Sequence, residues 1–96
     1  MKVKEITVQK LADYLRISET TDSFKDSLND YLNIAKEYIY NYTGLEREKI
    51  EDSVALCIVI FVLVQDMYDN RSLYVDDKNI NKVVSSILEQ HRRNFL

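Results

Sequence analysis

The chain places its apolar residues in one unbroken run and in three segments where they recur with the period of an α-helix. The run covers residues 54–64 and reads Val-Ala-Leu-Cys-Ile-Val-Ile-Phe-Val-Leu-Val. A helix that faces solvent on one side shows an apolar stripe, whereas a helix that is apolar all round must be covered all round. The run therefore predicts a buried helix at the centre of the fold, covered by the remaining segments or in part by a neighbouring subunit.

Two alternatives to a buried helix fail on length. Eleven residues span about 16 Å as a helix, whereas the hydrocarbon core of a membrane is about 30 Å thick, and Asp52 and Asp66 bound the run. Its β-branched residues favour a strand, but strands usually have about four to eight residues, and no turn former occurs from Ser53 to Asp69. We therefore predict a helix from about Ser53 to Asp69, with Asp52 as its N-cap.

Two amphipathic helices are expected before this run. The first extends from Val8 to Arg16 behind a Thr7 cap. The second extends from about Ser23 to Thr43, between an Asp22 cap and Gly44, which suits the left-handed position after a helix. The apolar face of the second helix is expected to contain Phe24, Leu28, Tyr31, Leu32, Ala35, Tyr38, Ile39 and Tyr42. Tyr40 falls on the opposite, polar face, which makes it the aromatic residue expected at the surface.

One more helix is expected near the C-terminus, from about Ile80 to Arg92 behind an Asn79 cap. Its apolar face is expected at Ile80, Val83, Val84, Ile87 and Leu88. The stretch from Asn70 to Lys78 has no period and reads as a loop or a short extended segment. The fold class that follows is all-α: a single domain over residues 1–96 with short, long, long and medium helices in an orthogonal, bundle-like arrangement.

Composition narrows the functional classes. The chain has no Pro and one Gly, which argues against a turn-rich β-fold. Thirteen basic and sixteen acidic residues give a net charge of −3, so the chain is not a generic binder of polyanions. The opening Met-Lys-Val-Lys-Glu-Ile has no apolar signal core, and we expect the protein to be made and kept in the cytoplasm.

Residues with catalytic potential are few and poorly grouped. His91 is the only histidine, and it continues the apolar face of the last helix. Cys57 lies inside the apolar run, where a buried thiol is inert. The carboxylate pairs Asp66 with Asp69 and Asp76 with Asp77 have no histidine or glycine-rich loop nearby. We therefore expect no enzymatic activity, no metal site and no cofactor.

The segment from Ile6 to Ser18 allows an alternative function. Its Thr cap, Leu-Ala pair and Ile-Ser turn are similar to the first helix of a helix-turn-helix, which would make the protein a small DNA-binding regulator. The following helix would have to read DNA, yet it carries Asp26, Asp30 and Glu37. A capped helix that packs on the core is the simpler interpretation of this segment.

The order of these elements resembles a known family. A short Thr-capped helix, an acidic spacer, a long helix ending in Ala-Lys-Glu-Tyr-Ile-Tyr-Asn-Tyr-Thr-Gly, an apolar helix ending in Met-Tyr-Asp-Asn-Arg and a final amphipathic helix follow one another. This pattern resembles the small head–tail connector, or adaptor, proteins of tailed bacteriophages, which are also described as DNA-packaging proteins of prophages. Family members often carry a Pro-rich turn before the apolar helix, where this chain has residues 45–51 without Pro.

The resemblance implies a structural subunit of the virion neck. Such subunits form a homo-oligomeric ring, of about twelve copies, by side-to-side contacts beneath the portal protein. The ring extends the DNA channel and docks a neck, stopper or tail protein, with DNA only as passing cargo and no membrane contact. A net acidic subunit agrees with a channel that does not grip phosphates.

Six residues are our candidates for contacts with these partners. Tyr40 is included for its position on a polar face, although a lone exposed aromatic residue is an equally good interpretation. Arg71 is included as well, although it can simply satisfy the last carbonyls of the apolar helix. The complete set is Tyr40, Arg71, Tyr74, Arg92, Arg93 and Phe95.

Overall fold

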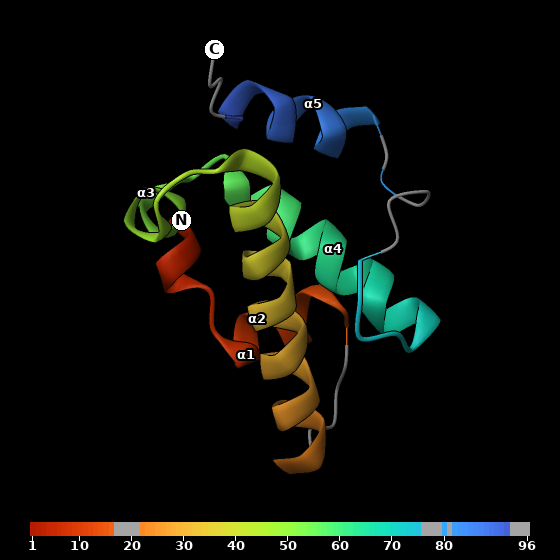
Figure 1. Ribbon diagram of the computed structural model, residues 1–96. Helices are drawn as coiled ribbons and strands as arrows, with labels where there is room; N and C mark the ends of the chain where they lie inside the picture. The colour runs from red at the N-terminus through yellow and green to blue at the C-terminus, as the bar shows by residue number, and fades with distance from the viewer. Residues whose placement is uncertain (17–21, 76–79, 81, 93–96) are drawn as a thin grey trace.

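The computed structural model describes residues 1–16, 22–75, 80 and 82–92, and the regular elements among them are all helical (Figure 1). They are a short 3-10 helix, η1 (Val3–Glu5), and the α-helices α1 (Val8–Tyr14), α2 (Asp22–Thr43), α3 (Arg47–Asp52), α4 (Leu56–Asn70) and α5 (Lys82–His91). The predicted all-α class is confirmed, and the four predicted helices correspond to α1, α2, α4 and α5. The short helix α3 was not predicted.

The apolar run forms α4, the central helix of the fold. Helices α1, α2 and α5 and the 3-10 helix η1 all contact α4. In Figure 1, α2 crosses in front of α4, and α5 lies across their upper ends. The buried residues of α4 are Leu56, Cys57, Val59, Ile60, Leu63, Val64 and Met67. The prediction that the run is a helix in the core is therefore confirmed.

Of the two expected ways to cover this run, enclosure by the chain's own segments alone is wrong for the described residues, and cover by a neighbouring subunit stays a prediction. Val54 is 59% exposed and Ile58 is 55% exposed. Phe61 and Val62, on the following turn, are half-buried. The helices that contact α4 thus leave one side of its N-terminal half open to solvent, and the described residues contain no further helix that covers it.

The predicted N-cap of the apolar helix is also wrong. Asp52 is the last residue of α3, and α4 begins at Leu56. The hydroxyl of Ser53 accepts a hydrogen bond from the Leu56 N–H at 3.1 Å. The Asp52 carboxylate instead pairs with Lys4 at 2.9 Å and, more distantly, with Lys2 at 3.9 Å. Asp52 therefore ties α3 to the N-terminal segment.

The Asp52–Lys4 pair predicts a small dependence of stability on pH. The hydrogen bond from Lys4 and its charge hold the pKa of Asp52 below its ordinary value. A carboxyl group with a lowered pKa stabilises the fold above its unfolded pKa of about 4, and this contribution is lost as the pH falls through the folded value. We expect Asp52→Asn to lower the Tm by a few degrees at most at pH 7, and its thermal unfolding curve to converge with that of the parent in acid.

Lys4→Gln is the matched variant for this test, because it removes the other partner of the same pair. Thermal unfolding between about pH 7 and pH 2 should show the same convergence for both variants. A loss of Tm that does not change with pH would show that Asp52 stabilises the chain by something other than its charge.

The ends of α1 and α2 agree closely with prediction. Thr7 caps α1 through its Oγ1, which accepts from the Lys10 N–H at 3.1 Å; α1 ends two residues before the predicted Arg16. Helix α2 begins one residue before the predicted Ser23, so Asp22 is its first residue rather than its cap, and it ends at Thr43 as predicted. Gly44 has φ 71° and donates its N–H to the Tyr40 carbonyl at 3.0 Å. The predicted left-handed glycine after α2 is thus confirmed.

Helix α5 differs in its start and in its apolar face. It begins at Lys82 rather than Ile80, and the predicted cap Asn79 lies outside the described residues. Val84 and Leu88 are buried, but Val83 is 64% exposed, so its assignment to the apolar face is wrong. Since α5 packs on both α2 and α4, its buried side is set by the angle at which it crosses them. The spacing of apolar residues along α5 does not predict this crossing angle.

Candidate interaction surfaces

The described residues contain no cluster suited to hold a metal ion: no group of three or more His, Cys, Asp or Glu side chains lies together there. The Nδ1 atom of His91 lies 2.8 Å from the Ile87 carbonyl one turn earlier. Cys57 is buried, its Sγ donates to the Met1 carbonyl at 3.0 Å, and burial raises the pKa of its thiol. A thiol with a raised pKa is a poor nucleophile. None of the described helices is both long and apolar enough for a membrane span.

Tyr40 belongs to a small surface cluster. The side chain lies at the C-terminal end of α2 and is exposed, as predicted. The guanidinium of Arg47, from α3, lies 4.5 Å from the centroid of its ring. Arg47 is held there by an ion pair with Glu37 at 2.9 Å. The sequence did not indicate Arg47, because without α3 nothing places residue 47 beside α2.

Arg71 acts at the end of α4. Its backbone is left-handed, with φ 52° and ψ 38°, and its N–H bonds to the carbonyls of Met67 and Tyr68. The alternative interpretation of Arg71, that it satisfies the last carbonyls of the apolar helix, is therefore confirmed. Its guanidinium lies 4.3 Å over the Tyr68 ring. Just beyond it, Leu73 and Tyr74 are 66% and 64% exposed, and these two residues are called the connection surface below.

Arg92 lies beside an aromatic residue of α2. Its guanidinium is 5.8 Å from the centroid of the Tyr42 ring and 3.6 Å from the Glu89 carboxylate. The Tyr42 hydroxyl donates to the same carboxylate at 2.5 Å, and this bond raises the pKa of Tyr42 because it stabilises the protonated phenol. The remaining candidates, Arg93 and Phe95, lie outside the described residues.

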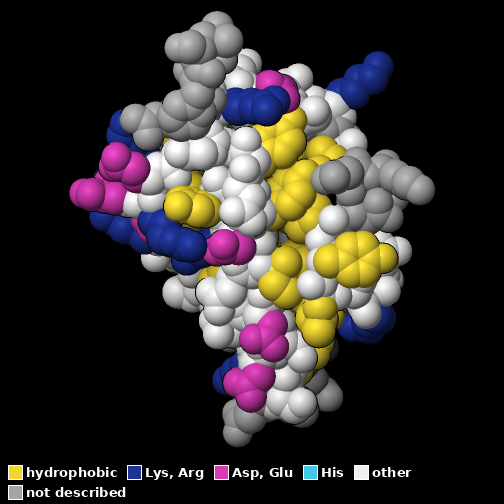
Figure 2. Space-filling model, in the orientation of Figure 1, with side chains coloured by type: hydrophobic (Ala, Val, Ile, Leu, Met, Phe, Trp, Pro, Cys, Tyr) yellow, Lys and Arg dark blue, Asp and Glu magenta, His cyan; other side chains and the backbone are white. Residues whose placement is uncertain are grey.

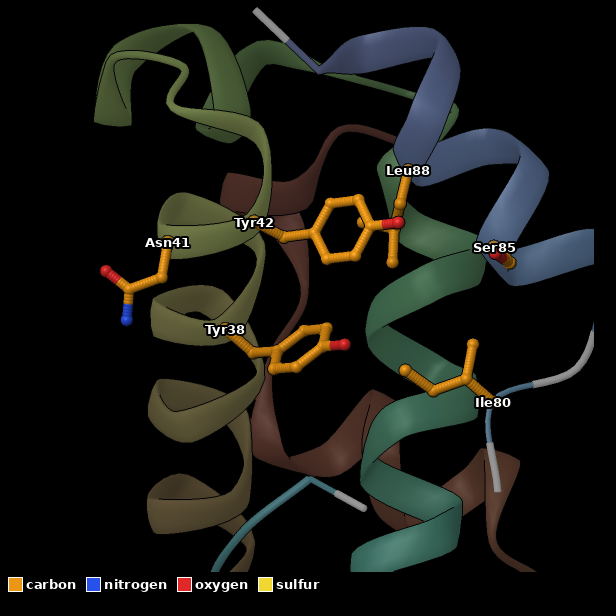
Figure 3. A pocket seen from close by; sticks show the side chains of 6 residues that line it. All are labelled: Tyr38, Asn41, Tyr42, Ile80, Ser85 and Leu88. Atoms are coloured by element: carbon orange, nitrogen blue, oxygen red, sulfur yellow. The ribbon is translucent and has the colours of Figure 1, made fainter. Parts of the chain in front are cut away.

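An open cavity lies between α2 and α5. Its volume is about 380 Å³, and it is lined by Tyr38, Asn41, Tyr42, Ile80, Ser85 and Leu88. Figure 3 shows Tyr38 and Tyr42 reaching from α2 toward Leu88 and Ile80, while Asn41 points away from them. In the view of Figure 2, hydrophobic side chains gather along the side of α2 that turns toward α4 and α5. The sequence placed both tyrosines on the apolar face of α2, but the cavity depends on how α5 docks.

A second apolar surface follows one side of α4, and sequence reasoning missed it. Val54, Ile58 and Phe61 follow one another at spacings of four and three residues, and the Tyr14 ring of α1 lies 4.8 Å from the Phe61 ring. We call these four residues the outer α4 surface. The only available signal was the apolar run itself, which is apolar on every side and therefore includes residues on whichever side is left open.

The described candidates thus lie in three separate clusters. Tyr40 lies with Arg47, Arg71 and Tyr74 follow α4, and Arg92 lies at the end of α5 beside Tyr42. Each arginine is held over an aromatic ring, an arrangement that fixes a cation at a surface without burying it. The arrangement suits several binding surfaces on one subunit rather than one chemical site.

Comparison with known proteins gave one family. A family model described as phage gp6-like head–tail connector protein matches residues 5–94. No curated protein and no solved structure matches the chain significantly. The matched range contains all five α-helices of the described chain. The match therefore covers the whole succession of helices and not a single segment.

Proposed function

The chain belongs to the phage gp6-like head–tail connector protein family, and from this premise we propose that it is a subunit of a ring beneath the portal of a tailed phage or prophage. A head–tail connector protein acts at the interface of the phage head and tail and contacts components of both. The proposal adds that one helical domain, repeated around the ring, extends the DNA channel and docks a neck, stopper or tail protein. No catalytic step is part of this role.

One observation carries the proposal: the family model matches nearly the whole chain, from residue 5 to residue 94. The outer α4 surface and the connection surface support it, because subunits of a closed ring contact their neighbours through two different patches. The net charge of −3 supports it as well, since a channel wall that must let DNA pass should not bind phosphates tightly. We propose that Tyr40, Arg71, Tyr74 and Arg92, together with Arg93 and Phe95, make contacts within this assembly.

The direct test is binding to the portal protein of the same phage. The purified chain and the purified portal are mixed, and the mass of the complex is measured by mass photometry or native mass spectrometry. We expect many copies of the chain on each portal, even if the free chain is a monomer. A chain that stays monomeric at high concentration and never binds the portal would contradict the proposal.

A further inference from the structure

Two exposed apolar surfaces lie at the two ends of α4. The outer α4 surface begins at Val54, just before the helix, and the connection surface at Leu73 and Tyr74 comes just after it. The outer α4 surface ends at Phe61, and α4 continues from there to Asn70. With a rise of 1.5 Å per residue, these nine steps separate the two surfaces by about 14 Å. They are therefore two distinct surfaces on one subunit.

The outer α4 surface is one continuous strip. The Cys57 N–H bonds to the Val54 carbonyl at 3.2 Å, so the turn before α4 brings Val54 into line with Ile58. Tyr14 extends the strip onto α1 through its contact with Phe61. Val54 and Ile58 are each more than half exposed, and Tyr14 is nearly so. Phe61 is half-buried and packs against the core, whereas the exposed parts of Val54, Ile58 and Tyr14 add little to it.

The connection surface is held in a defined shape. The Ser72 N–H bonds to the Met67 carbonyl at 3.0 Å, and the Ser72 hydroxyl donates to the Tyr74 carbonyl at 3.3 Å. The Arg71 guanidinium over the Tyr68 ring supplies a charged edge beside it. A surface that is ordered before binding loses less conformational entropy when it binds. Leu73 and Tyr74 are thus exposed on a segment whose backbone is held by hydrogen bonds.

We propose that the connection surface of one copy packs on the outer α4 surface of the next copy. This inference rests on the proposed function, because it assigns the side-to-side contact of the ring. Each surface exposes roughly 300 Å² of mostly apolar area, as estimated from its exposed fractions. A standard interface buries about 800 Å² per partner and is about 56–65% apolar. The two surfaces are therefore matched in size and supply most of the apolar part of such a contact.

A second copy explains both surfaces with a single kind of contact, whereas the portal and a tail protein would each have to cover one of them separately. A contact between two different patches repeats from copy to copy, and it closes into a ring when the rotation allows. The two surfaces lie at opposite ends of α4, so each subunit has one of each to offer to its two neighbours. This arrangement gives α4 the role of a spacer between successive contacts.

Cysteine cross-linking of the portal-bound chain tests the pairing. The double variant Ile58→Cys with Tyr74→Cys is treated with a short bismaleimide and run on a denaturing gel. The native Cys57 is buried, so it adds little background. We expect a ladder of dimers, trimers and larger species from the double variant, and only monomers from Ile58→Cys or Tyr74→Cys alone. The double variant Ile58→Cys with Asn29→Cys is the matched control, because Asn29 is exposed on the polar face of α2, and it should give no ladder.

The remaining outcomes separate this inference from the proposed function. Dimers from a single variant would show that the same surface meets itself, which overturns the inference. Portal binding without a ladder would overturn it too, while the proposed function stands. No portal binding and no self-association would overturn both. Independently, Ile58→Glu should weaken self-association on the portal at least about ten-fold with an unchanged Tm of the free chain; unchanged assembly would count against the inference.

Discussion

An Ile60→Ala variant should lose about 3 kcal/mol of its free energy of unfolding, whereas Ile58→Ala should lose less than about 1 kcal/mol. Ile60 is completely buried in α4, so its truncation removes apolar contacts and leaves a cavity. Ile58 lies two residues earlier on the same helix and is more than half exposed. Chemical denaturation of both variants, at a concentration at which the chain is a monomer, measures the difference.

The pair tests the partial covering of α4 directly, since the substitution and the helix are the same in both variants. Helix propensity changes equally in both, so the difference reports burial alone. A total stability of about 5–15 kcal/mol is usual for a domain, so the expected loss in Ile60→Ala leaves the fold measurable in most of this range. Equal losses at the two positions would mean that another part of the chain covers Ile58.

The identity of the central helix could be predicted, but its covered side could not. A run of eleven apolar residues is too long for a usual buried strand and too short for a membrane span. The same run has no polar residue to mark the side that faces solvent. The exposed side is decided by where α1, α2 and α5 contact the helix. Exposure of Val54 and Ile58 is thus a property of the packing and not of their own segment.

The start of α4 was misplaced for a different reason. Asp52 is a good N-cap residue, and only Ser53 separates it from the apolar run. The short helix α3, from Arg47 to Asp52, is less than two turns long, and such a segment has too few residues to show a period. Once α3 forms, Asp52 ends it, and its carboxylate lies near Lys4. A contact between the N-terminal segment and residue 52 is not visible in local sequence.

The candidate surfaces could likewise be predicted only in part. The exposure of Tyr40 follows from its position on the polar face of α2, and the cap at Arg71 follows from the end of the apolar run. The partners that define these surfaces come from elsewhere: Arg47 approaches Tyr40 from α3, and Tyr14 approaches Phe61 from α1. Local periodicity places a side chain on a face, whereas the neighbours of that face depend on how the helices are joined and packed.

A Val84→Ala variant should lose about 2 kcal/mol of its free energy of unfolding, while Val83→Ala should lose less than about 0.5 kcal/mol. The two valines are adjacent in α5, yet Val84 is buried and Val83 is mostly exposed. Val84 and Leu88 are the buried residues of α5, so the truncation removes a large part of what docks this helix. Thermal or chemical unfolding of the two variants measures the global effect.

Hydrogen exchange distinguishes a local from a global effect of Val84→Ala. Because α5 is attached to α2 and α4 through few buried side chains, the loss should appear first as faster exchange of α5 amides, with α4 amides protected nearly as before. The Tyr42–Glu89 bond and the wall formed by Leu88 belong to the same contact, so opening of α5 would also disrupt the cavity at Tyr38 and Tyr42. Equal acceleration in α4 and α5 would show instead that α5 unfolds only together with the core, and that the end of the chain is as firmly attached as its centre.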